Sequence, residues 1–133
     1  MTTVEIPSSV AAALPTLAVF DITNEVSRDV RKGSPDGDGP SSGLAYVTPL
    51  APTSLIRVTE RESGFFCDFE EMLSRLVPLN AATRERLLLG LLGARTEQIP
   101  FADGRLALGQ WQRVLLFGFN GDARADYQLT LVG

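Results

Sequence analysis

The side chains that this sequence offers for chemistry do not include imidazole. Its 133 residues contain no histidine and a single cysteine, Cys67. Imidazole is the common nitrogen ligand for zinc-like ions and the usual general base near neutral pH. We therefore predict no bound metal and no cofactor, and we expect a carboxylate or a tyrosine to carry out any proton transfer.

Glu60 and the run Gln110-Trp111-Gln112 are the groups best suited to a site. Glu60 could accept a proton in a cavity, or it could end a strand at the surface and pair with a neighbouring arginine. Trp111 could form a wall of a ligand pocket, or it could belong to the core or to a subunit interface. The two glutamines interrupt an apolar run, and buried amides require hydrogen-bond partners.

Apolar periodicity predicts the elements that would position these groups. Strands are expected at 16–22, 44–50 and 55–59, and a short helix follows Thr23 and ends at Gly33. A second helix is predicted from an Asp68 cap to Pro78, and a third from Asn80 or Thr83 to 93. The buried face predicted for the second helix is Phe69, Met72, Leu73, Leu76 and Val77.

The C-terminal part is predicted to form a meander of strands at 98–102, 105–108, 110–119 and 125–132. The dipeptides Asp103-Gly104 and Asn120-Gly121 suit tight hairpin turns, because both central residues of such turns need positive φ. Residues 110–119 are apolar on both faces, so this strand should lie inside the sheet or against another subunit.

Composition and charge fit one domain spanning residues 1–133, with 33–42 as a flexible loop. Hydrophobic residues make up 44% and charged residues 21% of the chain, as in globular domains. The net charge of −4 gives no electrostatic basis for binding nucleic acid or anionic lipid. No signal peptide or apolar run of membrane-spanning length is evident, so we expect a cytoplasmic location and no membrane partner.

Several segments in order resemble the YjbQ family, whose members are often described as secondary thiamine-phosphate synthases. They include Phe20-Asp21-Ile22-Thr23-Asn24-Glu25-Val26 and Asp103-Gly104-Arg105-Leu106-Ala107-Leu108-Gly109-Gln110-Trp111-Gln112. The second segment is similar to the family signature Asp-Gly-Arg-Leu-Ala-Leu-Gly-Thr-Trp-Gln. The resemblance covers residues 16–133. It implies an α+β fold, a compact antiparallel sheet or barrel-like core with two or three helices, assembled as a homotrimer.

The family site implied by the resemblance is a cluster of histidines with nearby carboxylates, placed to hold a metal or an anionic ligand. The family's His-Thr-Ser-Ala element falls on Ala51-Pro52-Thr53-Ser54, and a further site histidine becomes approximately Arg86. Only Glu60 matches the family's acidic position. Carried over by position, the catalytic candidates are Glu60, Ser54 and Gln112, and the ligand-binding candidates are Thr53, Arg57, Phe65, Arg86, Gln110 and Trp111.

These features lead to two main hypotheses of function. In the first, a cavity relined with Phe, Leu and Trp holds a largely apolar, polyketide-like intermediate and promotes its cyclisation or cycloaddition without a metal. In the second, the chain is a catalytically inactive trimeric scaffold or binding subunit. A further alternative is residual thiamine-phosphate synthase activity. A closed apolar cavity would favour the first hypothesis, and wide apolar exposure would favour the second.

Overall fold

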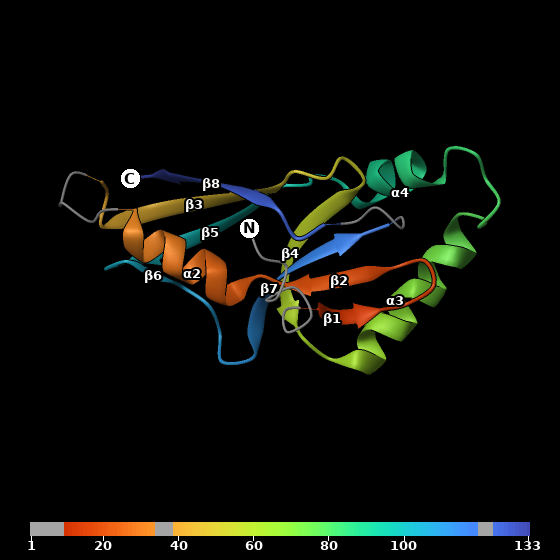
Figure 1. Cartoon of the computed structure of the whole chain (residues 1–133), viewed down its shortest axis with the longest axis horizontal. Coiled ribbons are helices and arrows are strands. Elements are labelled where there is room, and N and C mark those ends of the chain that lie inside the picture. Colours follow the sequence, from red (N-terminus) through yellow and green to blue (C-terminus); the bar gives the residue numbers. More distant parts are fainter. Residues whose placement is uncertain (1–9, 34–38, 120–123) are drawn as a thin grey trace.

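The computed structural model describes residues 10–33, 39–119 and 124–133, and there the chain forms an α+β fold. Within these residues, eight strands make two antiparallel sheets of four strands each, and three helices pack on them. The expected class is confirmed, but two separate sheets take the place of the expected barrel-like core. Figure 1 shows α2 at the end of the molecule formed by β3, β5 and β6, and α3 and α4 at the other end.

Sheet A has the strand order β1-β2-β7-β4, with β1 (Val10–Ala13), β2 (Ala18–Asp21), β7 (Gln112–Gly118) and β4 (Ser54–Glu60). Sheet B has the order β6-β5-β3-β8, with β6 (Arg105–Leu106), β5 (Glu97–Ala102), β3 (Ser42–Pro49) and β8 (Tyr127–Val132). The helices are α2 (Thr23–Lys32), α3 (Ser63–Leu76) and α4 (Arg84–Leu92). Within the described ranges, none of the helices is long and apolar enough to cross a bilayer.

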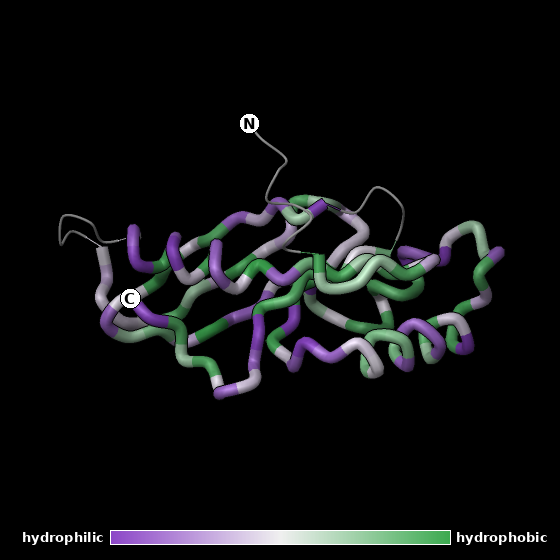
Figure 2. The backbone as a smooth tube through the Cα atoms, turned by 60° about the horizontal axis from the view of Figure 1, so that its bottom comes forward, coloured by the Kyte–Doolittle hydropathy of each residue, from purple (hydrophilic) through white to green (hydrophobic). Residues whose placement is uncertain are grey.

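The strand β7 lies in the interior of sheet A, between β2 and β4. Its side chains alternate between two cores. Val114 and Leu116 join a cluster with residues of α2 and both sheets, whereas Leu115 and Phe117 join a cluster with α3 and α4. Figure 2 shows hydrophobic stretches along the central strands and hydrophilic outer turns on α2. The prediction that this strand is buried on both faces is confirmed.

The predicted C-terminal meander is wrong. The turn Asp103-Gly104 does join β5 to β6, with φ of 54° and 73°, as a tight hairpin requires. However, β7 pairs with β2 and β4, whereas β8 pairs with β3 in the other sheet. A strand that is apolar on both faces is best buried between two neighbours, which explains its interior position. The predicted turn Asn120-Gly121 and half of the predicted flexible loop, residues 34–38, lie outside the described residues.

Helix α3 begins earlier than its sequence pattern predicted. Glu62 is the N-cap, and its carboxylate accepts hydrogen bonds from the backbone N–H groups of Gly64 at 3.0 Å and Phe65 at 2.6 Å. The predicted cap Asp68 therefore lies within the helix. Of the predicted buried face, Met72 and Leu76 are exposed, while Leu73 and Val77 are buried.

Candidate functional site

A buried carboxylate at the end of β2 organises one end of sheet A. Oδ1 of Asp21 accepts hydrogen bonds from the backbone N–H and the hydroxyl of Thr23, at 3.1 and 2.6 Å. Oδ2 accepts from Nη1 of Arg61 at 3.2 Å and from Nε of Arg113 at 3.0 Å. The Asp21 side chain is 2% exposed, whereas those of Arg61 and Arg113 are 43% and 36% exposed. We call these three residues the Arg–Asp–Arg cluster.

The charge of this cluster follows from the surroundings of Asp21. Burial alone would raise the pKa of the carboxyl group, but hydrogen bonds from Thr23 and Arg113 outweigh burial and hold the pKa below its ordinary 3.8. Asp21 is therefore ionised at neutral pH, and both guanidiniums are always charged. In this cluster, two partly exposed guanidiniums both donate hydrogen bonds to the single buried negative charge of Asp21.

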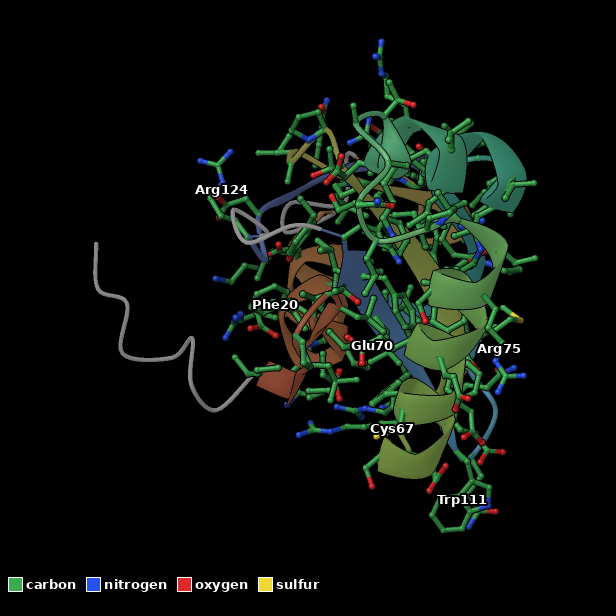
Figure 3. The ribbon with its side chains drawn as sticks, turned by 90° about the vertical axis from the view of Figure 1, so that its right-hand side faces the viewer. Phe20, Cys67, Glu70, Arg75, Trp111 and Arg124 are labelled. Carbon is green, nitrogen blue, oxygen red and sulfur yellow. The ribbon has the colours of Figure 1, made fainter. Side chains whose placement is uncertain are left out.

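A hollow of about 390 Å³ lies beside the cluster, and we call it the arginine pocket. Its lining consists of Asp21, Glu60, Arg61, Glu62, Gln110, Trp111 and Arg113. The indole of Trp111 is 68% exposed. Figure 3 shows Trp111 at one extremity of the molecule, beyond the end of α3 that carries Cys67. The pocket is therefore a polar, open hollow bordered by an aromatic ring.

A second hollow, of about 280 Å³, lies between β4 and α3, and we call it the apolar groove. Its lining consists of Leu55, Arg57, Val58, Thr59, Phe65, Phe69, Leu92 and Phe117. Phe65 stacks on Phe69 with ring centroids 5.8 Å apart, and Phe69 meets Phe117 edge-on at 5.5 Å. Three aromatic rings, with Phe69 contacting the other two, thus line this groove with a large apolar surface.

The guanidinium of Arg57 is held at the border of the apolar groove by helix α4. Its Nη2 donates to the carbonyl oxygen of Leu92 at 2.7 Å, and its Nη1 donates to those of Ala94 and Ile56, both at 2.8 Å. A cation at the C-terminal end of a helix is stabilised by the helix dipole. The predicted ligand-binding residue Arg57 therefore lines a hollow, but much of its hydrogen-bonding capacity supports the fold.

Ser54 and Glu60 occupy opposite ends of β4, about 20 Å apart at the usual rise per residue. Ser54 is fully buried, and its hydroxyl donates to the carbonyl oxygen of Ala51 at 2.6 Å. Glu60 lines the arginine pocket, whereas Ser54 lines neither that pocket nor the apolar groove. Within one chain, the structure does not bring the catalytic candidates Ser54 and Glu60 together.

The other predicted site residues are divided among several places. Glu60, Gln110 and Trp111 come together in the arginine pocket, whereas Phe65 and Arg57 line the apolar groove. Oε1 of Gln112 accepts a hydrogen bond from the N–H of Gly109 at 2.7 Å, which closes the loop before β7. The carbonyl oxygen of Thr53 accepts from the N–H of Phe119 at 3.1 Å, and Arg86 is exposed on α4, lining neither hollow.

Sequence reasoning missed the Arg–Asp–Arg cluster. A signal was present, because Arg113 is a charged residue near the start of the largely apolar strand β7, and Asp21 ends a strand of the same sheet. The pairing of β2 and β4 on either side of β7 brings Asp21, Arg61 and Arg113 together. That pairing joins segments far apart in the chain and could not be predicted from local pattern.

The acidic residues of the arginine pocket do not form a metal site with neighbouring ligands. Among the residues that the structure describes, no group of three or more His, Cys, Asp or Glu side chains could hold a metal ion. Both carboxylate oxygens of Glu62 accept N–H groups of α3, and those of Asp21 are engaged by Thr23 and the two arginines. The polar groups of this hollow are suited to hydrogen bonding with an organic ligand.

The chain is similar over most of its length to a known family. A family model described as "UPF0047 protein YjbQ-like" matches residues 14–133. A UPF0047 protein of Archaeoglobus fulgidus is 34% identical over 113 residues, which are 77% of this chain and 82% of that protein. One from Methanothermobacter thermautotrophicus is 26% identical over 123 residues, 86% of this chain and 82% of that protein.

Solved structures show the same fold. An uncharacterised protein of this family from Clostridium acetobutylicum superposes with a TM-score of 0.75 at 22% identity, covering 90% of this chain and 95% of that one. A hypothetical protein from Aeropyrum pernix gives a TM-score of 0.71 at 26% identity, covering 88% of this chain and 90% of that one. The two-sheet α+β architecture is therefore shared with these proteins.

Proposed function

Because the chain belongs to the YjbQ family yet contains no histidine, we propose that it binds a small, largely apolar molecule without a metal and promotes its cyclisation. The observation that carries this proposal is the apolar groove, in which Phe65, Phe69 and Phe117 form one continuous aromatic surface. Small-molecule sites typically have predominantly apolar linings and volumes of about 300–1,000 Å³, and the volume of this groove lies just below that range.

The chemistry that the groove supports depends on shape. A cycloaddition converts π bonds into σ bonds within the substrate, so no proton or electron has to leave the molecule. Holding a flexible chain in a reactive conformer can supply about 7–11 kcal/mol of the barrier in the best intramolecular cases. Arg57 borders the groove with a fixed guanidinium and could polarise a carbonyl group of the substrate. The proposed site is therefore the apolar groove. Two of its lining residues, Phe65 and Arg57, are ligand-binding candidates from the sequence.

Binding in the groove can be tested with decanol, a neutral apolar probe. We expect decanol to raise the melting temperature of the protein, because it binds the folded state. Phe65→Ala should lose most of this rise, since Phe65 lines the groove and is already partly exposed, so the fold should survive. Met72→Ala is the matched control, because Met72 is an exposed apolar residue of the same helix outside the groove. Equal losses in both variants would contradict groove binding.

Turnover would be measured with a linear substrate that carries a diene and an alkene on one flexible chain. The product should be an isomer of unchanged mass that elutes separately from the substrate. Phe65→Ala should slow its formation, and Met72→Ala should not. A rate equal to that in buffer would contradict the proposed activity even if decanol binds.

A scaffold role is the second candidate, and exposed apolar side chains favour it. Met72, Leu76, Leu79, Leu87 and Leu91, on and between α3 and α4, are each between 44% and 61% exposed. Figure 2 shows hydrophobic positions alternating with hydrophilic ones along these helices. Exposed apolar patches on soluble proteins commonly mark interaction surfaces. A second copy of the chain, as in the predicted homotrimer, would cover them.

Light scattering of the purified protein at micromolar concentration tests this assembly. We expect about three times the mass of one chain, consistent with a closed cyclic oligomer. Leu87→Glu should lower the mass, because it places a charge among the exposed leucines, whereas Arg86→Glu beside it should not. A monomer at all concentrations would contradict the trimer and the scaffold role that depends on it.

A further inference from the structure

We propose that the ligand of the apolar groove carries a carboxylate, which Arg61 and Arg113 bind in the arginine pocket. The substrate class would then be an amphipathic carboxylic acid, with its apolar body in the groove and its head group at the Arg–Asp–Arg cluster. This inference rests on the proposed function, because it assigns a second, polar end to the same binding site.

The two hollows are neighbours along sheet A. Leu55, Arg57 and Thr59 are alternate residues of β4 that line the groove, and Arg61 comes directly after Glu60, the last residue of this strand. Thr59 is paired directly with Arg113 of β7. Side chains of directly paired residues have Cβ atoms about 4.5–5.5 Å apart. A residue of the groove thus lies beside a residue of the arginine pocket.

The length of this surface suits a medium-chain acyl group. Arg57 at the border of the groove and Arg61 in the arginine pocket are about 13 Å apart along the strand direction at the usual rise. Phe65 and Phe69 of α3 also line the groove. An extended acyl chain between the phenylalanines and β4 would place its carboxylate beside Arg61.

The Arg–Asp–Arg cluster has hydrogen-bonding capacity left for such a head group. Within the described part of the chain, Arg61 donates to Asp21 alone, and Arg113 donates to Asp21 and, at 3.4 Å, to Asn24. Among the residues described, most N–H groups of both guanidiniums therefore have no protein acceptor. Guanidinium–carboxylate bonds are charge-assisted and often bidentate, and Asp21 holds both donors in place.

Glu60 and Glu62 also line the arginine pocket, and their carboxylates differ in how strongly they repel an anionic ligand. Glu62 uses both oxygens to cap α3, so its charge is offset by the N-terminal end of the helix. Glu60 is exposed, and no protein group donates to its carboxylate in the residues described. The negative charge of Glu60 should repel a carboxylate ligand and weaken its binding. Neutralising Glu60 should therefore raise the affinity for the carboxylate, whereas neutralising Arg61 should lower it.

The experiment compares decanoate with decanol on the full-length protein by isothermal titration at neutral pH, below the concentration at which decanoate forms micelles. We expect decanoate to bind about tenfold more tightly, because hydrogen bonds to charged groups contribute more than neutral ones. Added salt should weaken decanoate binding and leave decanol binding unchanged. Equal affinities for the two probes, or an affinity for decanoate that does not change with salt, would overturn the inference.

Variants locate the head group. Arg61→Gln should abolish the preference for decanoate while leaving the affinity for decanol unchanged, and Glu60→Gln should increase the preference. Arg86→Gln, which removes an exposed arginine outside both hollows, should change neither. If Arg61→Gln does not fold, Arg113→Lys, which keeps the charge but loses the guanidinium fork, should reduce the preference instead.

The outcomes separate this inference from the proposed function. Binding of both probes without a preference for decanoate would overturn the carboxylate assignment and leave the apolar groove as the site. A preference that survives Arg61→Gln and Arg113→Lys would also overturn the assignment. Failure of both probes to bind would overturn the proposed function together with the inference.

Discussion

Phe117→Ala is expected to lower the free energy of unfolding by about 3–5 kcal/mol, the range for removing a buried phenylalanine. Phe117 is 2% exposed, and its ring contacts Phe66 and Phe69 of α3 edge-on at 6.1 and 5.5 Å. Its removal leaves a cavity between β7 and the helix that covers it. Urea denaturation followed by circular dichroism at constant protein concentration measures the change.

The matched control is Phe65→Ala, since Phe65 belongs to the same aromatic group but is 39% exposed. We expect it to cost about 1–2 kcal/mol, because Phe65 is only partly buried and its removal takes away less buried apolar area. Equal losses for the two variants would mean that α3 does not dock on β7 as described. The apolar groove, which needs this docking, would then lose its wall.

Asp21→Asn is expected to destabilise the fold by about 2–3 kcal/mol at neutral pH, because buried hydrogen bonds to a charged acceptor are lost. Most of this effect should come from the contacts with Thr23, which is buried, since the bonds to Arg61 and Arg113 are partly screened by solvent. Asp68→Asn, at an exposed position on α3, should change stability by less than about 0.5 kcal/mol.

The stability difference between the wild type and Asp21→Asn should depend on pH, because the pKa of Asp21 is lowered in the folded state. A carboxyl group whose pKa is lower in the folded than in the unfolded state contributes stability that is fully present above its unfolded value. The contribution is lost as pH falls below 3.8 toward the folded-state pKa. The stability gap between wild type and Asp21→Asn should therefore narrow below that pH. A gap that stays constant from neutral to acid pH would show that the carboxylate charge is not responsible.

The sequence alone determined the family, the α+β class and most strands of this protein. The signature around Asp103-Gly104 fixes a hairpin, because positive φ at both residues is a local requirement that neighbouring chain segments cannot replace. The alternating apolar residues of β7 predicted burial on both faces, since side chains of a strand must alternate. The lack of histidine was likewise evident from composition.

Only the tertiary structure decided which strands are neighbours and where the hollows lie. Strand pairing is non-local, so β8 pairs with β3, although a tight-turn dipeptide follows β7 in the sequence. The pairing of β7 with β2 and β4 places Arg61 and Arg113 around the buried carboxylate of Asp21, and Ser54 and Glu60 lie at opposite ends of β4. The local sequence pattern predicts which face of a strand a side chain occupies. A site, however, consists of residues from different strands, and which of these residues are neighbours depends on the packing of the whole chain.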